Sequence, residues 1–278
     1  MMLLKGMGAG IGLRIPHIQT ILRDSPEVPW FEVHICNFLR GGLNRQLLHL
    51  VAQQYPLSFH GVSMNLGGVD PLDLDYLQRL RGAVEEFMPF LISEHACFTA
   101  HQNQHFHDLL PVPYTKNALI NMADRVDQVQ NILGRQILVE NVSRYFSYPQ
   151  SEMCESEFLM GLCQRTGCGL LLDLNNAFVN QCNHGESVAD FIAGLPLAAI
   201  GEVHLAGHTQ QGDILVDTHS QRVADPVWQI YREFSELCPD VPCLIEWDSE
   251  LPDFDCLNAE RIKAQSISAG VEGAVKWA

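Results

Sequence analysis

The sequence predicts a single (β/α)8 barrel, or TIM barrel, that spans residues 1–278. Three observations lead to this fold class: eight short apolar runs, a stretch with helical spacing after each run, and no Pro/Ser-rich linker between them. Continuous rather than alternating hydrophobicity is typical of parallel strands that are covered on both faces. A doubly wound open sheet is the alternative, but eight alternations favour a closed barrel.

The predicted strands follow one another along the chain. In order they are MGAGIGL (7–13), WFEVHIC (30–36), LSFHGVS (57–63), FLISEH (90–95), QILVEN (136–141), GLLLDLNN (169–176), IGEVHLAGH (200–208) and CLIEWD (243–248).

The segments between these runs carry helix signals. In VDPLDLDYLQRLRGAVEEF, Asp70 is expected to cap a helix with Pro71 in its first turn, and one apolar face holds Leu74, Leu77 and Leu80.

Three further segments repeat the pattern. In TKNALINMADRVDQVQNILG, Thr115 is expected to cap the helix and Gly134 to end it. The same spacing recurs in SEMCESEFLMGLCQRTG and ADPVWQIYREFSELC.

Composition limits the classes of function. The 33 Asp and Glu residues outnumber the 17 Lys and Arg residues, and no basic run offers a surface for nucleic acid. The nine cysteines form no Cys-x-x-Cys pair, which indicates reduced thiols in a cytoplasmic protein. The start MMLLKGMGAG is too short and Gly-rich for a signal peptide, and no apolar run reaches membrane-spanning length. We therefore expect neither nucleic acid nor membrane as a partner.

Acidic, imidazole and amide side chains gather near the ends of the predicted strands. They are His60, His95, Glu140, Asp173, Asn176, His204 and Glu246, with Asp217 and His219 in the loop after the seventh strand. These strand ends open onto one face of a barrel, so the side chains are expected to converge. Four of them are carboxylates, which cannot all ionise together unless cations offset their charge. A mixed nitrogen and oxygen set suits Fe, Mn or Zn, and the sequence therefore predicts a multinuclear metal centre.

The motifs GIGLR, FEVH, HGVS, ISEH, DLLPVPYT, LVENVS, LLLDLNNAFVN, EVHLAGH, DTHS and LIEWD resemble, in this order, those of a known family. It is the DUF692 or UPF0276-like family, also called the multinuclear non-heme iron-dependent oxidative enzymes. The resemblance covers nearly the whole chain. It implies a barrel of the xylose-isomerase-like type with two or three iron ions in mixed Fe(II)/Fe(III) states.

The resemblance also implies a division of the ligands. The first iron would be bound by His60, His95 and Glu140. Glu140 would bridge to a second iron, whose other ligands would be Asp173, His204 and Glu246. A third position would use Asn176, Asp217 and His219, and we expect it to be partly occupied because an amide oxygen binds iron weakly. The candidate catalytic residues are Glu140, Asp173, His204 and Asp217.

Members of this family use O2 to modify cysteines, or sometimes other residues, of ribosomally made peptides. The products include thiooxazole and oxazolone/thioamide groups, often in copper-binding peptides. The chain length is similar to that of members of the bufferin-type branch. Resemblance to this branch implies a helical partner protein that presents the precursor peptide. One departure is Cys36, because the family commonly has Glu-Asn after FEVH, and substrate contacts are expected to differ there.

Two other functions stay open. One is a Zn- or Mn-dependent hydrolase or isomerase on the same barrel, although a sugar isomerase usually needs a lysine near its metals, and Lys5, Lys116, Lys263 and Lys276 fall outside the strand ends. The other is a non-catalytic metal-binding partner protein. The histidines of HQNQHFHDLL are expected in a solvated connection, and His34 can be an ordinary core residue.

Overall fold

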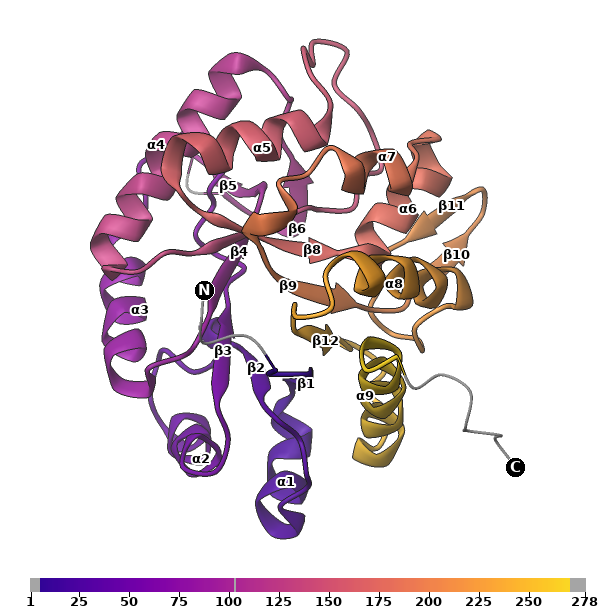
Figure 1. Cartoon of the computed structure of the whole chain (residues 1–278). Helices are drawn as coiled ribbons and strands as arrows, with labels where there is room; N and C mark the ends of the chain where they lie inside the picture. Colours follow the sequence, from indigo (N-terminus) through magenta and orange to yellow (C-terminus); the bar gives the residue numbers. More distant parts are fainter. Residues whose placement is uncertain (1–5, 103, 271–278) are drawn as a thin grey trace.

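The computed structural model describes residues 6–102 and 104–270, and it confirms the predicted barrel. Eight parallel strands close in the order β1-β12-β9-β8-β7-β4-β3-β2, with helices around the outside (Figure 1). The strands are β1 (Ala9–Leu13), β2 (Phe31–His34), β3 (Leu57–His60), β4 (Ile92–His95), β7 (Leu138–Glu140), β8 (Gly169–Asp173), β9 (Ile200–Leu205) and β12 (Cys243–Ile245).

The helices follow the strands in alternation. They are α1 (Ile18–Asp24), α2 (Leu43–Ala52), α3 (Leu74–Phe87), α4 (Lys116–Leu133), α5 (Glu155–Thr166), α6 (Leu174–His184), α7 (Val188–Ala193), α8 (Asp225–Leu237) and α9 (Phe254–Ser268). Short 3-10 helices lie at Ile15–His17, Ile35–Asn37 and Leu197–Ala199. Within the described ranges, no helix combines the length and the apolar character that crossing a membrane requires.

Two predicted helix starts can be compared with the structure. The prediction that Asp70 caps α3 is wrong, because Asp73 accepts the hydrogen bond from the backbone N–H of Tyr76 and the helix begins after it. Leu74, now in the first turn, is 58% exposed and does not join the buried face. The cap of α4 at Thr115 and its end at Gly134, whose φ is 64°, are confirmed.

The strand predicted over 169–176 ends earlier than expected. Asp173 is its last residue, and Oδ1 of Asp173 accepts a 2.6 Å hydrogen bond from the backbone N–H of Asn176. This bond caps α6, so the two asparagines after Leu174 lie in the first helical turn. The same carboxylate therefore ends a strand, starts a helix and faces the barrel mouth.

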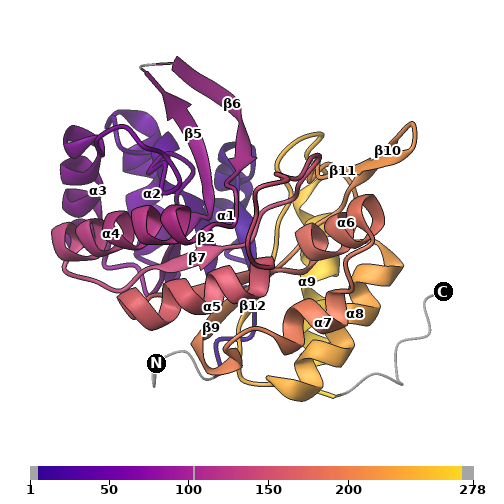
Figure 2. The same ribbon diagram turned by 90° about the horizontal axis from the view of Figure 1, so that it is seen from above.

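Two hairpins stand out on the side of the barrel where the strands end (Figure 2). The first pairs β5 (Cys97–His101) with β6 (Gln104–Pro111), and the second pairs β10 (Thr209–Gln211) with β11 (Ile214–Val216). The connection expected for HQNQHFHDLL is confirmed as a link between β4 and α4, and most of it forms the arms of the first hairpin. Its histidines are exposed, as expected for a solvated segment.

The barrel interior is built in layers, because side chains two residues apart on a strand point the same way. His60 stands above Ser58 on β3, and His204 stands above Glu202 on β9. Glu32 on β2 joins the middle layer, and these side chains are buried.

Large apolar side chains form the barrel floor, which comprises Trp30, Phe90, Leu138 and Leu171. Leu138 and Leu171 pack together with Phe90, whose ring lies edge-on to Trp30 at a centroid distance of 5.2 Å. A Cβ at Gly10 would lie 2.4 Å from the Trp30 ring, so only glycine leaves room for the indole. The polar layers lie between this apolar floor and the barrel mouth.

Candidate metal centre

The side chains predicted to bind metal come together at the barrel mouth. The strands hold their backbones in register, for example His95 beside Glu140 and Asp173 beside His204. Glu246 follows β12 directly. All five are at most 5% exposed.

His60, His95 and Glu140 form the first group. Their ligand atoms form a near-equilateral triangle, with 3.3 Å between the two Nε2 atoms and 3.4 Å and 3.2 Å from these to Oε2 of Glu140. Atoms bound about 2.1 Å from one ion lie about 3.0 Å apart at right angles and about 3.4 Å apart at the tetrahedral angle. The triangle therefore has the dimensions of one face of a coordination shell.

Hydrogen bonds on the far side of each ring set the tautomers in this group. Nδ1 of His60 donates to Oγ of Ser93 at 2.7 Å, and that hydroxyl donates to the carbonyl of Phe59. Nδ1 of His95 lies 3.1 Å from the carbonyl of Gly61 and 3.2 Å from a carboxylate oxygen of Glu94, both of which can only accept. Both Nε2 atoms therefore present lone pairs to the triangle. Oε2 of Glu140 is buried without a hydrogen-bond partner, so three acceptors face one point and a cation fits there.

The second group shares Glu140 with the first. Oε1 of Glu140 lies 3.9 Å from Nδ1 of His204, and the same nitrogen lies 3.0 Å from Oε2 of Glu246. Oδ2 of Asp173 is buried without a hydrogen-bond partner, and Glu140, Asp173 and His204 can bring one ligand atom each within 4.8 Å of one another. The two oxygens of Glu140 thus face two different groups, which is the arrangement expected of a bridging carboxylate.

The third group differs from the expected set. Nε2 of His219 lies 2.7 Å from Oδ1 of Asp217, so these two side chains reach the same point. His219 also comes close to Asp173 and Glu246, which were assigned only to the second group. Asn176 has a buried, unpartnered Oδ1 and lines the same cavity, while its amide nitrogen donates to the carbonyl of Asn141.

Electrostatics shows that the cluster needs positive charge. Burial raises the pKa of Glu140 to about 8, and the charges of Asp173 and Glu246 add to the rise while His95 and His204 oppose it. Burial also raises the pKa of Asp173 to about 7. Burial would lower the pKa of His95, but the charges of Glu140 and Glu94 outweigh it and raise this pKa to about 9. Protons must fill the cluster unless metal ions replace them.

Two buried acids beneath the cluster were not predicted. Nε2 of His204 lies 3.3 Å from Oε2 of Glu32 and 3.9 Å from Oε1 of Glu202, and Oγ of Ser58 donates to the other oxygen of Glu202 at 3.4 Å. Glu32 can accept the Nε2 proton of His204, which leaves Nδ1 for a metal. The sequence holds a signal for both acids, because FEVH and GEVH each place a Glu two residues before a His on a strand.

Arg14 was also missed. Its Nε donates to Oδ1 of Asp248 at 3.0 Å, and Oδ2 of Asp248 accepts from Nδ1 of His219 at 3.1 Å. Arg14 thereby fixes the ring of His219 through Asp248. It also lies 3.4 Å from Oε1 of Glu246, which is 3.1 Å from Nε2 of His34.

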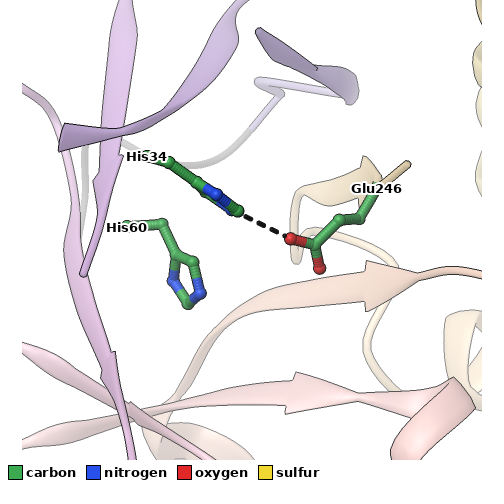
Figure 3. A group of neighbouring side chains, drawn as sticks. All are labelled: His34, His60 and Glu246. Carbon is green, nitrogen blue, oxygen red and sulfur yellow. Dashed lines mark hydrogen bonds and ion pairs between the residues drawn. The ribbon is translucent and has the colours of Figure 1, made fainter. Parts of the chain in front are cut away.

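His34 lies in the site and is not an ordinary core residue. Figure 3 shows His34, His60 and Glu246 pointing toward one another. These three can bring ligand atoms together, yet Nη2 of Arg14 lies 3.4 Å from Nε2 of His34. A cationic group already occupies this position, so a metal ion there would be repelled. His34 instead lines the open cavity of about 220 Å³ above the cluster.

Comparisons with known proteins find a matching family model and similar sequences. A family model described as RiPP precursor modification enzyme MbnB/TglH/ChrH matches residues 8–269. A UPF0276 protein of Chromobacterium violaceum is 46% identical over 263 residues, which cover 95% of each chain. A UPF0276 protein of Paraburkholderia phytofirmans is 42% identical over 266 residues, which cover 94% of this chain and 87% of the relative.

Solved structures share the fold at much lower identity. D-psicose 3-epimerase from Clostridium cellulolyticum has a TM-score of 0.61 at 12% identity, and endonuclease IV from Thermus thermophilus has 0.61 at 13%. In both cases the match covers 95% of this chain and 99% of the solved chain. These similarities concern the barrel alone.

Proposed function

The chain belongs to the RiPP precursor modification enzyme MbnB/TglH/ChrH family, and from this premise we propose that it is a multinuclear iron, O2-dependent oxidase of peptide cysteines. The substrate would be a ribosomally synthesised precursor peptide, and the products would be of the thiooxazole or oxazolone/thioamide type. The proposal that the chain binds metal ions rests on the triangle of three acceptor atoms on His60, His95 and Glu140.

We propose three ion positions. Glu140 would connect the first and second ions, and Asp173, His204 and Glu246 would complete the second. Asp217 and His219 would hold the third with the amide oxygen of Asn176. Buried acceptors without hydrogen-bond partners on Glu140, Asp173 and Asn176 support this assignment. Iron would supply one-electron chemistry with O2, which the protein side chains cannot supply.

The protein would contribute position and charge to the reaction. The cavity above the cluster would give a cysteine side chain access to the ion positions, and its walls would limit the water around the reacting thiolate. Glu140, Asp173, His204 and Asp217 are the residues on which we expect catalysis to depend most. O2 would be the electron acceptor: two hydrogens removed from the peptide reduce it to peroxide, and four reduce it to two waters.

A helical partner protein that presents the peptide is part of the proposal. Large apolar side chains on the connections around the mouth support a docking surface for it. They are Phe106, Tyr145, Phe146 and Ile214, each between 38% and 43% exposed.

Anaerobic metal analysis tests the proposal. Protein from iron-replete cells should hold two or more irons per chain and should consume O2 only when a Cys-containing peptide is added. Stoichiometric zinc without O2 uptake would instead favour a hydrolase. An isomerase is disfavoured by the described lysines, since Lys116 lies at the start of α4 and Lys263 packs over Trp228 on the outer helices.

A further inference from the structure

A second, larger cavity lies beside the metal centre. It has a volume of about 880 Å³, within the range of ligand pockets, and lies between the β5–β6 hairpin and the connection from β3 to α3. Val62, His107, Asp108 and Leu109 line both this cavity and the smaller one above the cluster. We call it the flanking cavity, because a molecule in it would lie next to the ion positions.

A bulge in β6 forms the wall between the two cavities. Phe98 pairs with Leu110 and Ala100 pairs with His105, so Thr99 alone faces residues 106–109. The backbone N–H of Thr99 donates to Oδ1 of Asn65 at 2.8 Å and points away from β6. One residue of β5 cannot pair with four of β6, so peptide groups of the bulge are available to an extended chain in the cavity.

The flanking cavity is acidic. Asp70, Asp73 and Asp108 line it against a single guanidinium, that of Arg125. The two Nη atoms of Arg125 donate to the neutral backbone carbonyls of Asp70 and Asn65 at 2.6 Å and 2.9 Å, so the guanidinium keeps its charge and offsets one of the three carboxylates. The charge that remains in the cavity is therefore negative and complements a basic side chain.

The cysteine that departs from the family pattern, Cys36, lies against the side of the flanking cavity that the β3–α3 connection and α3 form. Sγ of Cys36 is 3.2 Å from the hydroxyl of Tyr76 and 3.5 Å from Oγ of Ser63, and both of these residues line the flanking cavity. Cys36 thus affects the shape of this cavity and lies outside all three ligand groups.

Resting on the proposed function, we propose that the flanking cavity binds the part of the precursor peptide next to the reacting cysteine and selects basic residues there. The peptide would lie extended along residues 106–109, with its cysteine in the smaller cavity. Asp70 and Asp108 would be the residues that set this preference.

The test uses two short capped peptides with one central cysteine, flanked by lysines in one and by glutamates in the other. Binding to the iron-loaded full chain is measured anaerobically by fluorescence anisotropy. The lysine peptide should bind about tenfold more tightly, as expected for two partly exposed charge pairs. The preference should fall to about twofold or less in Asp70→Asn/Asp108→Asn. The control Asp213→Asn/Glu236→Gln removes the same charge from other exposed sites and should keep the preference.

Ala100→Trp gives a second, steric variant, because Ala100 lines the flanking cavity without contributing to the ligand groups. It should abolish binding of the lysine peptide and leave iron content unchanged. Equal binding of both peptides to the unmodified chain, or an unchanged preference in Asp70→Asn/Asp108→Asn, overturns the inference.

The two proposals fail in different ways. Preferential binding of the lysine peptide without O2 uptake or a mass change would support the cavity and contradict the oxidase. Equal oxidation of both peptides by every variant would support the oxidase and contradict the cavity.

Discussion

Replacing Glu140 by Gln tests the arrangement of the metal centre most directly. The two oxygens of Glu140 face different groups, with Oε2 3.2 Å from Nε2 of His95 and Oε1 3.9 Å from Nδ1 of His204. Glu140→Gln keeps the shape of the side chain, removes one negative charge and leaves a single weak acceptor oxygen. We therefore expect two ions to be lost together.

The size of the effect follows from the ligand count. Removing a hydrogen-bond partner of a metal ligand typically costs about 10- to 100-fold in affinity, so losing a charged ligand should cost more than about 100-fold for each ion. His219→Ala removes a side chain that belongs to the third group and should release at most one ion. Both variants are loaded with Fe(II) anaerobically, dialysed and analysed for iron per chain. Equal losses from the two would refute the bridging role.

The stability of the metal-free protein separates ligand loss from unfolding. Burial raises the pKa of Glu140 to about 8 from a usual 4.5, so between these values the unfolded chain ionises while the metal-free fold stays protonated, and the free energy of unfolding falls as pH rises. Glu140→Gln has no titratable group at this position and so lacks this pH-dependent loss of stability. At pH 8, its metal-free melting temperature should therefore equal or exceed that of the unmodified protein. A large drop in melting temperature would mean that lost iron reports on damage to the fold.

Three further substitutions have defined outcomes. Arg14→Gln should loosen Asp248 and weaken the ion at His219 by about 10- to 100-fold, as seen in metal titrations, while the other ions remain. Asn176→His should raise occupancy of that third ion, measured as iron per chain, because an imidazole nitrogen binds iron more strongly than an amide oxygen. Burial raises the pKa of Glu155 to about 7 from a usual 4.5, so between these values the unfolded chain ionises first and the free energy of unfolding falls as pH rises. Glu155→Gln lacks this loss, so its free energy of unfolding relative to the unmodified protein should rise by about 3 kcal/mol over this interval.

Matched variants control these experiments. Arg222→Gln removes an exposed arginine that pairs with Glu260, so it should leave iron binding unchanged. Asn183→His adds an imidazole outside the cluster and should not raise iron content. Glu236→Gln removes an exposed acid and should show no pH-dependent gain in stability. If Arg14→Gln released every ion, or none, the link through Asp248 to His219 would be contradicted.

The convergence of the candidate ligands could be predicted because it depends on fold geometry alone. His60, His95, Glu140 and Asp173 each end a strand, and the ends of parallel barrel strands share one face. Their grouping could not be predicted, because the position of His219 between two groups depends on the path of the loop after β11. Sequence spacing carries no information about that path.

The missed residues have physical reasons. The spacing of Glu32 and Glu202 before a histidine was a signal, but both acids lie inside apolar strands, where continuous hydrophobicity hides which face a side chain takes. Arg14 pairs with a residue 234 positions away, a distance that no local pattern reveals. The β5–β6 hairpin was missed because its exposed strand β6 is rich in polar residues and bulged, and so has the composition of a loop.

The barrel floor determines the order in which the protein can be assembled with its ligands. Trp30, Phe90, Leu138 and Leu171 fill the end of the barrel opposite the mouth, so the iron, oxygen and peptide of the proposed reaction would all have to arrive through the mouth. A peptide bound in the mouth would then block the route to the ion positions. Iron loading would have to precede peptide arrival, and chelators would strip the resting protein faster than the complex.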